Sequence, residues 1–380
     1  MTARAYLVAA RRSAVAPRNG ALSRLEVDAL AAPVVGAVLA DAGVTGEAVD
    51  EVLLGNALYG GGNPARRVAL LAGLPEAVPA LTLDRQCASG LDAILLAARL
   101  IESGRAHCVL AGGVESYSRA PIRMTRPLEA GDAPRAYDRP PFTPWPERDP
   151  DMDAAAADLA ARLGIDQEAQ IAWTVDSHAR ARRAEAEQRF AAELVPVAGA
   201  TRDAFARDLD PRTCARSPVL ARCGETALRA ATAAVAADAA AVVCVVSDTW
   251  LARHGAAHAV RIVDGVSAGG DPTLPGLAPV AAGRALAART GVDLAAVALC
   301  EVMEAYAVQA IACVTRLGLD PDRVNRSGGA LARGHPIGAS GAILAVRAFH
   351  ELAQAPRGAQ ALAAIASAGG LGTAALFERV

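Results

Sequence analysis

The stretch that decides the fold is Asn325-Arg-Ser-Gly-Gly-Ala-Leu-Ala-Arg-Gly-His335-Pro-Ile-Gly-Ala-Ser-Gly341. It is a glycine-rich loop around one histidine, and an apolar helical pattern follows it directly. Glycine lets a backbone turn tightly and approach a ligand closely. An imidazole held in such a loop is a candidate acid, base or donor to an oxyanion.

A second loop-to-helix junction occurs earlier in the chain. The segment Asp84-Arg-Gln-Cys87-Ala-Ser-Gly90 also opens an apolar helical pattern, with one cysteine at its start. At a helix N-terminus the helix dipole and the unpaired backbone N–H groups favour a thiolate. The same N–H groups could hold the oxygen of a thioester carbonyl. Cys87 and His335 are therefore a candidate nucleophile and its activator.

The composition limits the possible functions. The chain has 380 residues, 53% of them hydrophobic and 21% charged, and its net charge is −2. These values predict a compact protein without a charge bias toward nucleic acid or an anionic membrane. No apolar run is long enough for a membrane span, and the first ten residues lack the pattern of a signal peptide. We therefore expect no nucleic-acid or membrane partner and a cytoplasmic location.

The cysteines and histidines do not predict a metal site. The seven cysteines are dispersed and include no C-x-x-C pair. His254 and His258 are four residues apart, but no third ligand accompanies them. We expect the six cysteines other than Cys87 to be small buried hydrophobic residues. Lysine is absent, which excludes a Schiff-base lysine and a P-loop lysine.

Three pairs of similar segments recur at an offset of about 250 residues. Cys87–Gly90 resembles Gly338–Gly341, and Val109–Gly113 resembles Ala366–Gly370. The third pair combines a helix end and a strand, at 39–54 and at 286–300. The repeat predicts a duplicated α/β protein whose parallel sheets are covered by helices. Its expected parts are residues 1–117 with 236–268, an insertion at 118–235 with helices at 152–163 and 167–190, and residues 269–380.

Together these motifs resemble the thiolase family over nearly the whole chain. Besides the cysteine segment and the histidine loop, the resemblance rests on Asn63-Pro-Ala-Arg66, Gly112-Gly-Val-Glu-Ser116, Glu301-Val-Met-Glu-Ala-Tyr306 and Gly369-Gly-Leu-Gly372. It implies a five-layered fold of two duplicated βαβαβαββ halves with an inserted loop domain. It also implies a homodimer or a dimer of dimers. The implied reaction is acyl transfer, with a coenzyme A thioester as substrate and no permanently bound cofactor.

The resemblance also implies roles for particular residues. Cys87 corresponds to the acylated nucleophile, and His335 to its activator and to an oxyanion-hole donor. The backbone N–H groups of Cys87 and Ala368 correspond to a second oxyanion hole. Met152 is a candidate substrate contact.

The chain departs from the family pattern where carbon–carbon bond chemistry occurs. Where a thiolase has Asn-Glu-Ala-Phe, this chain has Met303-Glu-Ala-Tyr306. The family's asparagine holds a water that assists His335, which methionine cannot do. Where a thiolase has a second cysteine that moves the α-proton, this chain has Ala366, and Ser367 beside it would point to the opposite face of a strand. Ala234-Val235 replaces a Ser-Gly pair that contacts pantetheine. We expect acyl transfer to survive and ordinary Claisen or thiolysis chemistry to be impaired.

Two other interpretations remain. Gly265-Val-Ser267-Ala-Gly269 fits the G-x-S-x-G pattern of an α/β-hydrolase with Ser267 as nucleophile. Such an elbow must lead into a helix, and Pro272 and Pro275 oppose one. Alternatively, the chain is a non-catalytic or partner-dependent subunit that kept the fold, since fold alone does not prove activity. The joint retention of Cys87 and His335 with their glycines argues against that loss.

Overall fold

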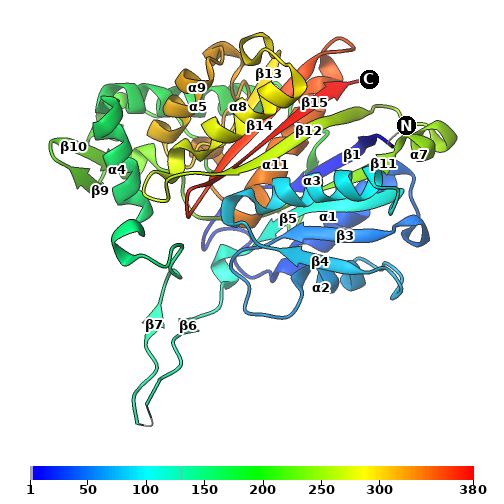
Figure 1. Ribbon diagram of the computed structural model, residues 1–380, viewed down its shortest axis with the longest axis horizontal. Coiled ribbons are helices and arrows are strands. Elements are labelled where there is room, and N and C mark those ends of the chain that lie inside the picture. Colours follow the sequence, from blue (N-terminus) through cyan, green and yellow to red (C-terminus); the bar gives the residue numbers. More distant parts are fainter. Residues whose placement is uncertain (1–2, 130) are drawn as a thin grey trace.

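The computed structural model describes residues 3–129 and 131–380, and its core is one large mixed sheet (Figure 1). The strands of this sheet are β1 (Ala5–Ser13), β2 (Ala16–Pro17), β3 (Glu51–Gly55), β4 (Ala80–Leu83), β5 (Cys108–Glu115), β8 (Leu194–Val195), β11 (Ala237–Ser247), β12 (Val260–Gly269), β13 (Leu299–Val302), β14 (Gln360–Ser367) and β15 (Leu371–Arg379). They follow the order β13-β14-β15-β12-β1-β11-β5-β3-β4. The short strands β2 and β8 pair with β11 and β1 beside this path.

The sheet is mixed, so the prediction of parallel sheets is right only in part. β3 pairs in parallel with β4 and β5, and β13 pairs in parallel with β14. The pairs β1–β11, β11–β5, β12–β15 and β14–β15 are antiparallel. A tight turn joins β14 to β15, with Gly369 at φ 77° and Gly370 at φ 76°. Because strands joined by so short a turn must run antiparallel, the crossover pattern ends there.

The sheet divides into two similar halves. β12 pairs with β15 from Val260–Arg379 to Gly269–Leu371, but it meets β1 at only two residue pairs. β12 thus begins the second half as β1 begins the first. We propose that the halves meet before β12, not after residue 268 as the sequence led us to expect.

Three hydrophobic clusters describe how the helices cover these half-sheets. The central cluster contains α3 and α11, which pack against strands of both halves. α1 and α2 cover the outer face of the first half, and α8 and α9 that of the second. The helices are α1 (Val27–Ala42), α2 (Pro64–Leu71), α3 (Ser89–Glu102), α8 (Ala278–Thr290), α9 (Ala307–Leu317) and α11 (Ile337–Gln354). The order across the molecule is therefore helices, half-sheet, helices, half-sheet and helices.

The expected insertion lies beside this core. It holds α4 (Met152–Leu163), α5 (Gln167–Ala186), α6 (Pro211–Ala215) and the hairpin of β9 (Val219–Cys223) and β10 (Thr226–Arg229). The pair β6 (Arg123–Met124) and β7 (Ala136–Tyr137) belongs to a long arm that extends away from the body in Figure 1. α4 has its predicted bounds. α5 ends before residue 190, because Gln188 adopts a left-handed conformation with φ 56°.

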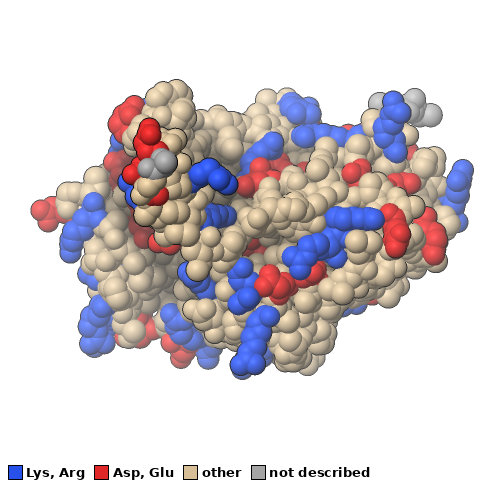
Figure 2. All heavy atoms as spheres, turned by 90° about the horizontal axis from the view of Figure 1, so that it is seen from below, with Lys and Arg blue, Asp and Glu red and all other residues tan. Residues whose placement is uncertain are grey.

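The surface carries both signs of charge. Figure 2 shows arginine side chains interspersed with aspartate and glutamate on the face seen from below. This distribution agrees with the net charge of −2. Within residues 3–129 and 131–380, no helix is both long and apolar enough to cross a membrane.

The starts of α3 and α11 pack against each other at glycines. A Cβ atom added to Gly90 would lie 2.7 Å from the Gly338 carbonyl oxygen, and one added to Gly341 would lie 2.6 Å from the Leu91 nitrogen. Contacts this short with backbone leave no room for any side chain. The repeated Ala-Ser-Gly sequence is thus explained by the close approach of two helix starts, which the repeat alone could not reveal.

This contact predicts a large effect of one methyl group. Gly90→Ala should destabilise the protein by about 1–3 kcal/mol, because the backbones must separate to admit the Cβ atom. Gly36→Ala in α1 is the matched control, since a Cβ atom there meets nothing within 4 Å. Replacing that helical glycine should stabilise by about 0.5–1 kcal/mol. Denaturant unfolding measures both, and equal stabilities of the two variants would contradict the packing argument.

Candidate active site

Cys87 lies in a single 3₁₀ turn, Gln86–Ala88, that runs directly into α3. β4 leads the chain to this turn, and Gln86 adopts a left-handed backbone conformation with φ 49°. The Asp84 carboxylate stabilises the bend by accepting a hydrogen bond from the Gln86 N–H at 2.7 Å. The prediction of a cysteine at the start of a helix therefore matches the structure.

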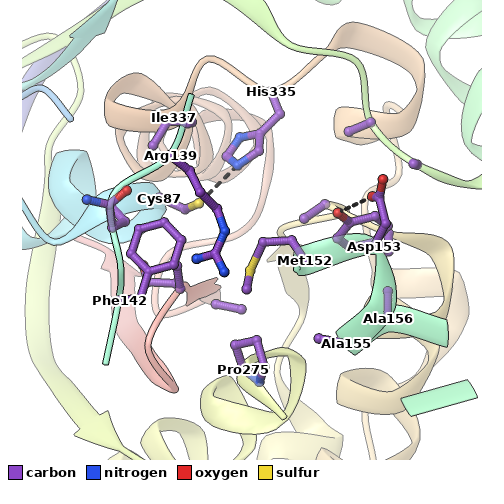
Figure 3. A pocket seen from close by; sticks show the side chains of 18 of the residues that line it. Cys87, Arg139, Phe142, Met152, Asp153, Ala155, Ala156, Pro275, His335 and Ile337 are labelled. Carbon is purple, nitrogen blue, oxygen red and sulfur yellow. Dashed lines mark hydrogen bonds between the residues drawn. The ribbon is translucent and has the colours of Figure 1, made fainter. Parts of the chain in front are cut away.

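His335 meets Cys87 across the junction of α3 and α11. The His335 Nε2 atom lies 3.0 Å from the Cys87 sulfur (Figure 3). The backbone of His335 is fixed from the other side, because its N–H donates to the Val235 carbonyl at 2.7 Å. The structure thus brings together two residues that are 248 positions apart in the chain.

Ser340 determines the orientation and tautomer of this imidazole. Its hydroxyl oxygen lies 2.7 Å from His335 Nδ1, and the hydroxyl donates to the Pro336 carbonyl at 2.9 Å. The hydroxyl must therefore accept from Nδ1–H, which leaves Nε2 as the unprotonated nitrogen facing the thiol. Ser340 was not among the residues that the sequence motifs indicated as functional. A signal was present, since side chains in a helix lean toward its N-terminus and can reach a preceding loop.

The electrostatics of the pair differ from the expected preformed thiolate. Desolvation, with a smaller contribution from the nearby Glu115 carboxylate, raises the pKa of the Cys87 thiol to about 12. Burial lowers the pKa of His335 to about 4. Both groups are therefore neutral at neutral pH. The helix start does not outweigh desolvation here, and the unprotonated His335 Nε2 lies where it can accept the thiol proton.

The backbone N–H groups of Cys87 and Ala368 lower the pKa of the Cys87 thiol by hydrogen bonding, although burial outweighs this effect. Ala368 lies in the turn after β14, just before the two glycines with positive φ. This geometry supports the proposed oxyanion hole, because donors aimed at developing negative charge are what such a hole requires.

The Ser367 hydroxyl is engaged by the backbone on both sides of Cys87. Its hydroxyl accepts from the Ala88 N–H and donates to the Arg85 carbonyl, both at 2.8 Å. It therefore ties the end of β14 to the turn that carries Cys87. The sequence analysis predicted that this side chain points away from Ala366, and its hydrogen bonds agree with that direction.

Two buried carboxylates position the histidine loop. Glu115, at the end of β5, accepts from the Gly338 N–H at 2.8 Å and from the Ala57 N–H at 3.0 Å. Its burial raises the pKa of the Glu115 carboxyl to about 7. Glu304 accepts from the Ser177 hydroxyl at 2.8 Å and from the Leu331 N–H at 3.2 Å. Both glutamates belong to motifs that carry the family resemblance, but the motifs do not indicate these roles. The roles depend on backbone groups from distant segments.

The Cys87–His335 pair opens into a cavity of about 490 Å³. This volume is ordinary for a small-molecule site. Met152 and Phe142 of the insertion contribute to its wall (Figure 3). Ala366 also lines the cavity. Met303 is not among the described residues that line the cavity. Its side chain is 2% exposed and packs in the central hydrophobic cluster, so the expectation that it lines the site needs correction.

The other candidates have structural roles. Ser267 lies within β12 rather than at a strand-to-helix turn, and its hydroxyl donates to Asp92 at 2.7 Å. A hydrolase nucleophile at Ser267 is therefore excluded by the backbone. Ala234, which replaces the first residue of the family's Ser-Gly pair, lines the cavity. Among the described residues, no group of three His, Cys, Asp or Glu side chains could hold a metal ion.

Comparisons with known proteins agree with this geometry. Residues 5–249 match the family model of the thiolase N-terminal domain, and residues 256–379 match that of the thiolase C-terminal domain. The chain belongs to the thiolase family. It is an acyltransferase of the thiolase type.

Related proteins and a related crystal structure align with almost the whole chain. A Bacillus subtilis (strain 168) protein named as an acetyl-CoA C-acetyltransferase is 37% identical over 98% of this chain and 99% of its own length. The beta-ketoadipyl-CoA thiolase of Acinetobacter baylyi is 36% identical over 99% of both chains. The crystal structure of the Bacillus anthracis acetyl-CoA acetyltransferase superposes with a TM-score of 0.93 at 30% identity, covering 100% of this chain and 99% of that one.

The neutral pair predicts the pH profile of Cys87 alkylation by iodoacetamide. The rate should rise with pH through the His335 pKa of about 4, because unprotonated imidazole then accepts the thiol proton. The rate should then stay nearly constant through the neutral range. The alkylation rate of a free thiol would instead keep rising there, because its pKa is about 8.5. His335→Ala should lower this plateau roughly 10²–10⁴-fold. Cys223, the other partly buried cysteine, should not respond to that variant. A Cys87 rate that keeps rising with pH through neutrality would contradict this reading.

Proposed function

We propose that this thiolase-family protein transfers acyl groups through a thioester on Cys87, with a coenzyme A thioester as donor. The observation that carries the proposal is the 3.0 Å contact between the Cys87 sulfur and unprotonated His335 Nε2 beside an open cavity. The names of the acetyl-CoA acetyltransferase relatives support the class of donor.

The geometry supports a stepwise acylation. His335 Nε2 takes the thiol proton while the sulfur attacks the thioester carbonyl. The carbonyl oxygen becomes an oxyanion that the N–H groups of Cys87 and Ala368 hold. When the tetrahedral intermediate collapses, the imidazolium returns the proton to the departing coenzyme A thiol. Ser340 stabilises the imidazolium by accepting from Nδ1–H throughout.

Carbon–carbon bond chemistry has weaker support. A Claisen condensation requires removal of an α-proton from a second thioester by a base at the reacting carbon. Ala366 offers no such group, and the Ser367 hydroxyl is engaged by Arg85 and Ala88. Buried Met303 brings no polar atom that could hold a water near His335. The acceptor we favour is therefore a nucleophile that needs no α-proton abstraction.

We also propose that the protein is a homodimer or a dimer of dimers. β4, which delivers the chain to Cys87, is the last strand of the sheet and pairs on one side with β3. Leu81 in this strand is 43% exposed. An unprotected apolar edge is normally covered, and pairing with the same edge of a second copy would cover it symmetrically.

Acylation can be measured by intact mass spectrometry after incubation with acetyl-CoA and longer acyl-CoA thioesters. We expect one added acyl group, lost in Cys87→Ala and retained in Cys223→Ala. Thiolysis of acetoacetyl-CoA should be feeble, since a missing general base costs roughly 10²–10⁴-fold. Ala366→Cys should raise it, because Ala366 lines the cavity. Robust thiolysis by the unchanged protein would contradict the argument about the acceptor, and no acylation by any thioester would favour the non-catalytic or partner-dependent subunit.

The dimer can be tested by sedimentation equilibrium at micromolar concentration. We expect a dimer or tetramer, and Leu81→Asp should increase the monomer fraction because it places like charges on both sides of the two-fold axis. Val219→Asp on β9 is the control, since Val219 is also exposed but belongs to the β9–β10 hairpin of the insertion. A stable monomer of the unchanged protein would rule the proposal out.

A further inference from the structure

A tyrosine and an aspartate form a polar pair in the wall of the Cys87 cavity. The Tyr306 hydroxyl donates to the Asp153 carboxylate at 2.7 Å, and both residues line the cavity. In Figure 3, Asp153 and its dashed hydrogen bond lie on the other side of Met152 from Cys87 and His335. The pair therefore faces the space that a bound substrate would occupy.

Both side chains are held by the starts of helices. Tyr306 is the residue before α9, and its backbone also bridges to Ala233. Asp153 lies in the first turn of α4, whose start Asp151 caps. Because the family pattern has phenylalanine where this chain has Tyr306, the hydroxyl is an addition to the site. It meets a carboxylate from a different segment, so the pair depends on two separate sequence choices.

The pair offers hydrogen-bond acceptors and no free donor. Burial, and then the Asp153 carboxylate, raise the pKa of Tyr306. The phenol therefore keeps its proton, which it donates in the hydrogen bond to Asp153. A carboxylate can accept several hydrogen bonds, and Asp153 forms no ion pair within the described parts of the chain. Met152, Ala156 and Leu159 are apolar neighbours in the wall, which also includes Arg139, whose guanidinium is paired with Asp149. An acceptor in such surroundings favours a ligand that brings a donor.

We propose that Asp153 and Tyr306 determine substrate specificity by accepting a hydrogen bond from a hydroxyl group on the acyl chain. This inference rests on the proposed acylation of Cys87. The Asp153 carboxylate would repel a carboxylate group at the same position of the acyl chain. The site should therefore prefer a hydroxyacyl thioester to its hydrocarbon analogue, and the analogue to a dicarboxylic one.

The test compares coenzyme A thioesters of matched shape. A series of ω-hydroxyacyl thioesters of increasing length is paired with analogues in which methyl or carboxylate replaces the hydroxyl. The rate constant of Cys87 acylation is measured for each by mass spectrometry. At the length that reaches the pair, the hydroxyl should accelerate acylation roughly 10- to 100-fold over methyl, as expected for one hydrogen bond to a charged group.

Three variants separate the possible outcomes. Asp153→Ala should abolish the hydroxyl preference, and Asp153→Asn should retain part of it while removing the penalty on the carboxylate. Asp158→Ala, on the same helix with its carboxylate paired to Arg162, should change neither ratio. Because each ratio compares two thioesters on one variant, a partial loss of folded protein cancels.

The inference and the proposed function fail in different ways. Equal acylation by hydroxyl and methyl analogues at every length, or a preference that survives Asp153→Ala, would overturn the inference while Cys87 acylation stands. No acylation by any thioester would instead overturn the proposed function. In that case the affinities of Cys87→Ala for the same thioesters, measured by calorimetry, test the preference without the reaction.

Discussion

The site depends on the contact between the starts of two helices that the duplicated halves contribute. Gly90 and Gly341 leave these helix starts at a separation that no side chain allows. The residues that precede each helix, Cys87 and His335, then lie 3.0 Å apart at their reactive atoms. The duplication is thus more than a repeated architecture, since each half supplies one reactive group and neither half holds both.

Burial gives this pair its chemical character. The same packing that joins the helix starts removes water, and it moves the pKa values of thiol and imidazole in opposite directions. A neutral pair results, with the proton on sulfur until an electrophile arrives. Ser340 and Glu115 compensate for the cost of dry surroundings by satisfying the imidazole and the backbone of its loop.

The residues that depart from the family pattern have two different effects. Met303 and Ala366 remove polar groups near the reacting carbon, and Met303 is absorbed into the core. Tyr306 adds a hydroxyl farther along the cavity, where Asp153 accepts its hydrogen bond. Compared with the family pattern, the chain thus lacks two polar side chains and has one additional hydroxyl group in the cavity wall.

Helix signals and glycine-framed motifs are local patterns, so residue spacing was enough to predict the duplicated α/β fold, the family, the Cys87–His335 couple and the bounds of α4. The antiparallel strand pairs, the burial of Met303, the neutral state of the pair and the partners Ser340, Glu115 and Asp153 emerged only in the folded structure. These features depend on which distant backbone and side-chain groups meet, and on how much water their packing excludes. The spacing of residues along the chain specifies neither these long-range contacts nor the amount of water that they exclude.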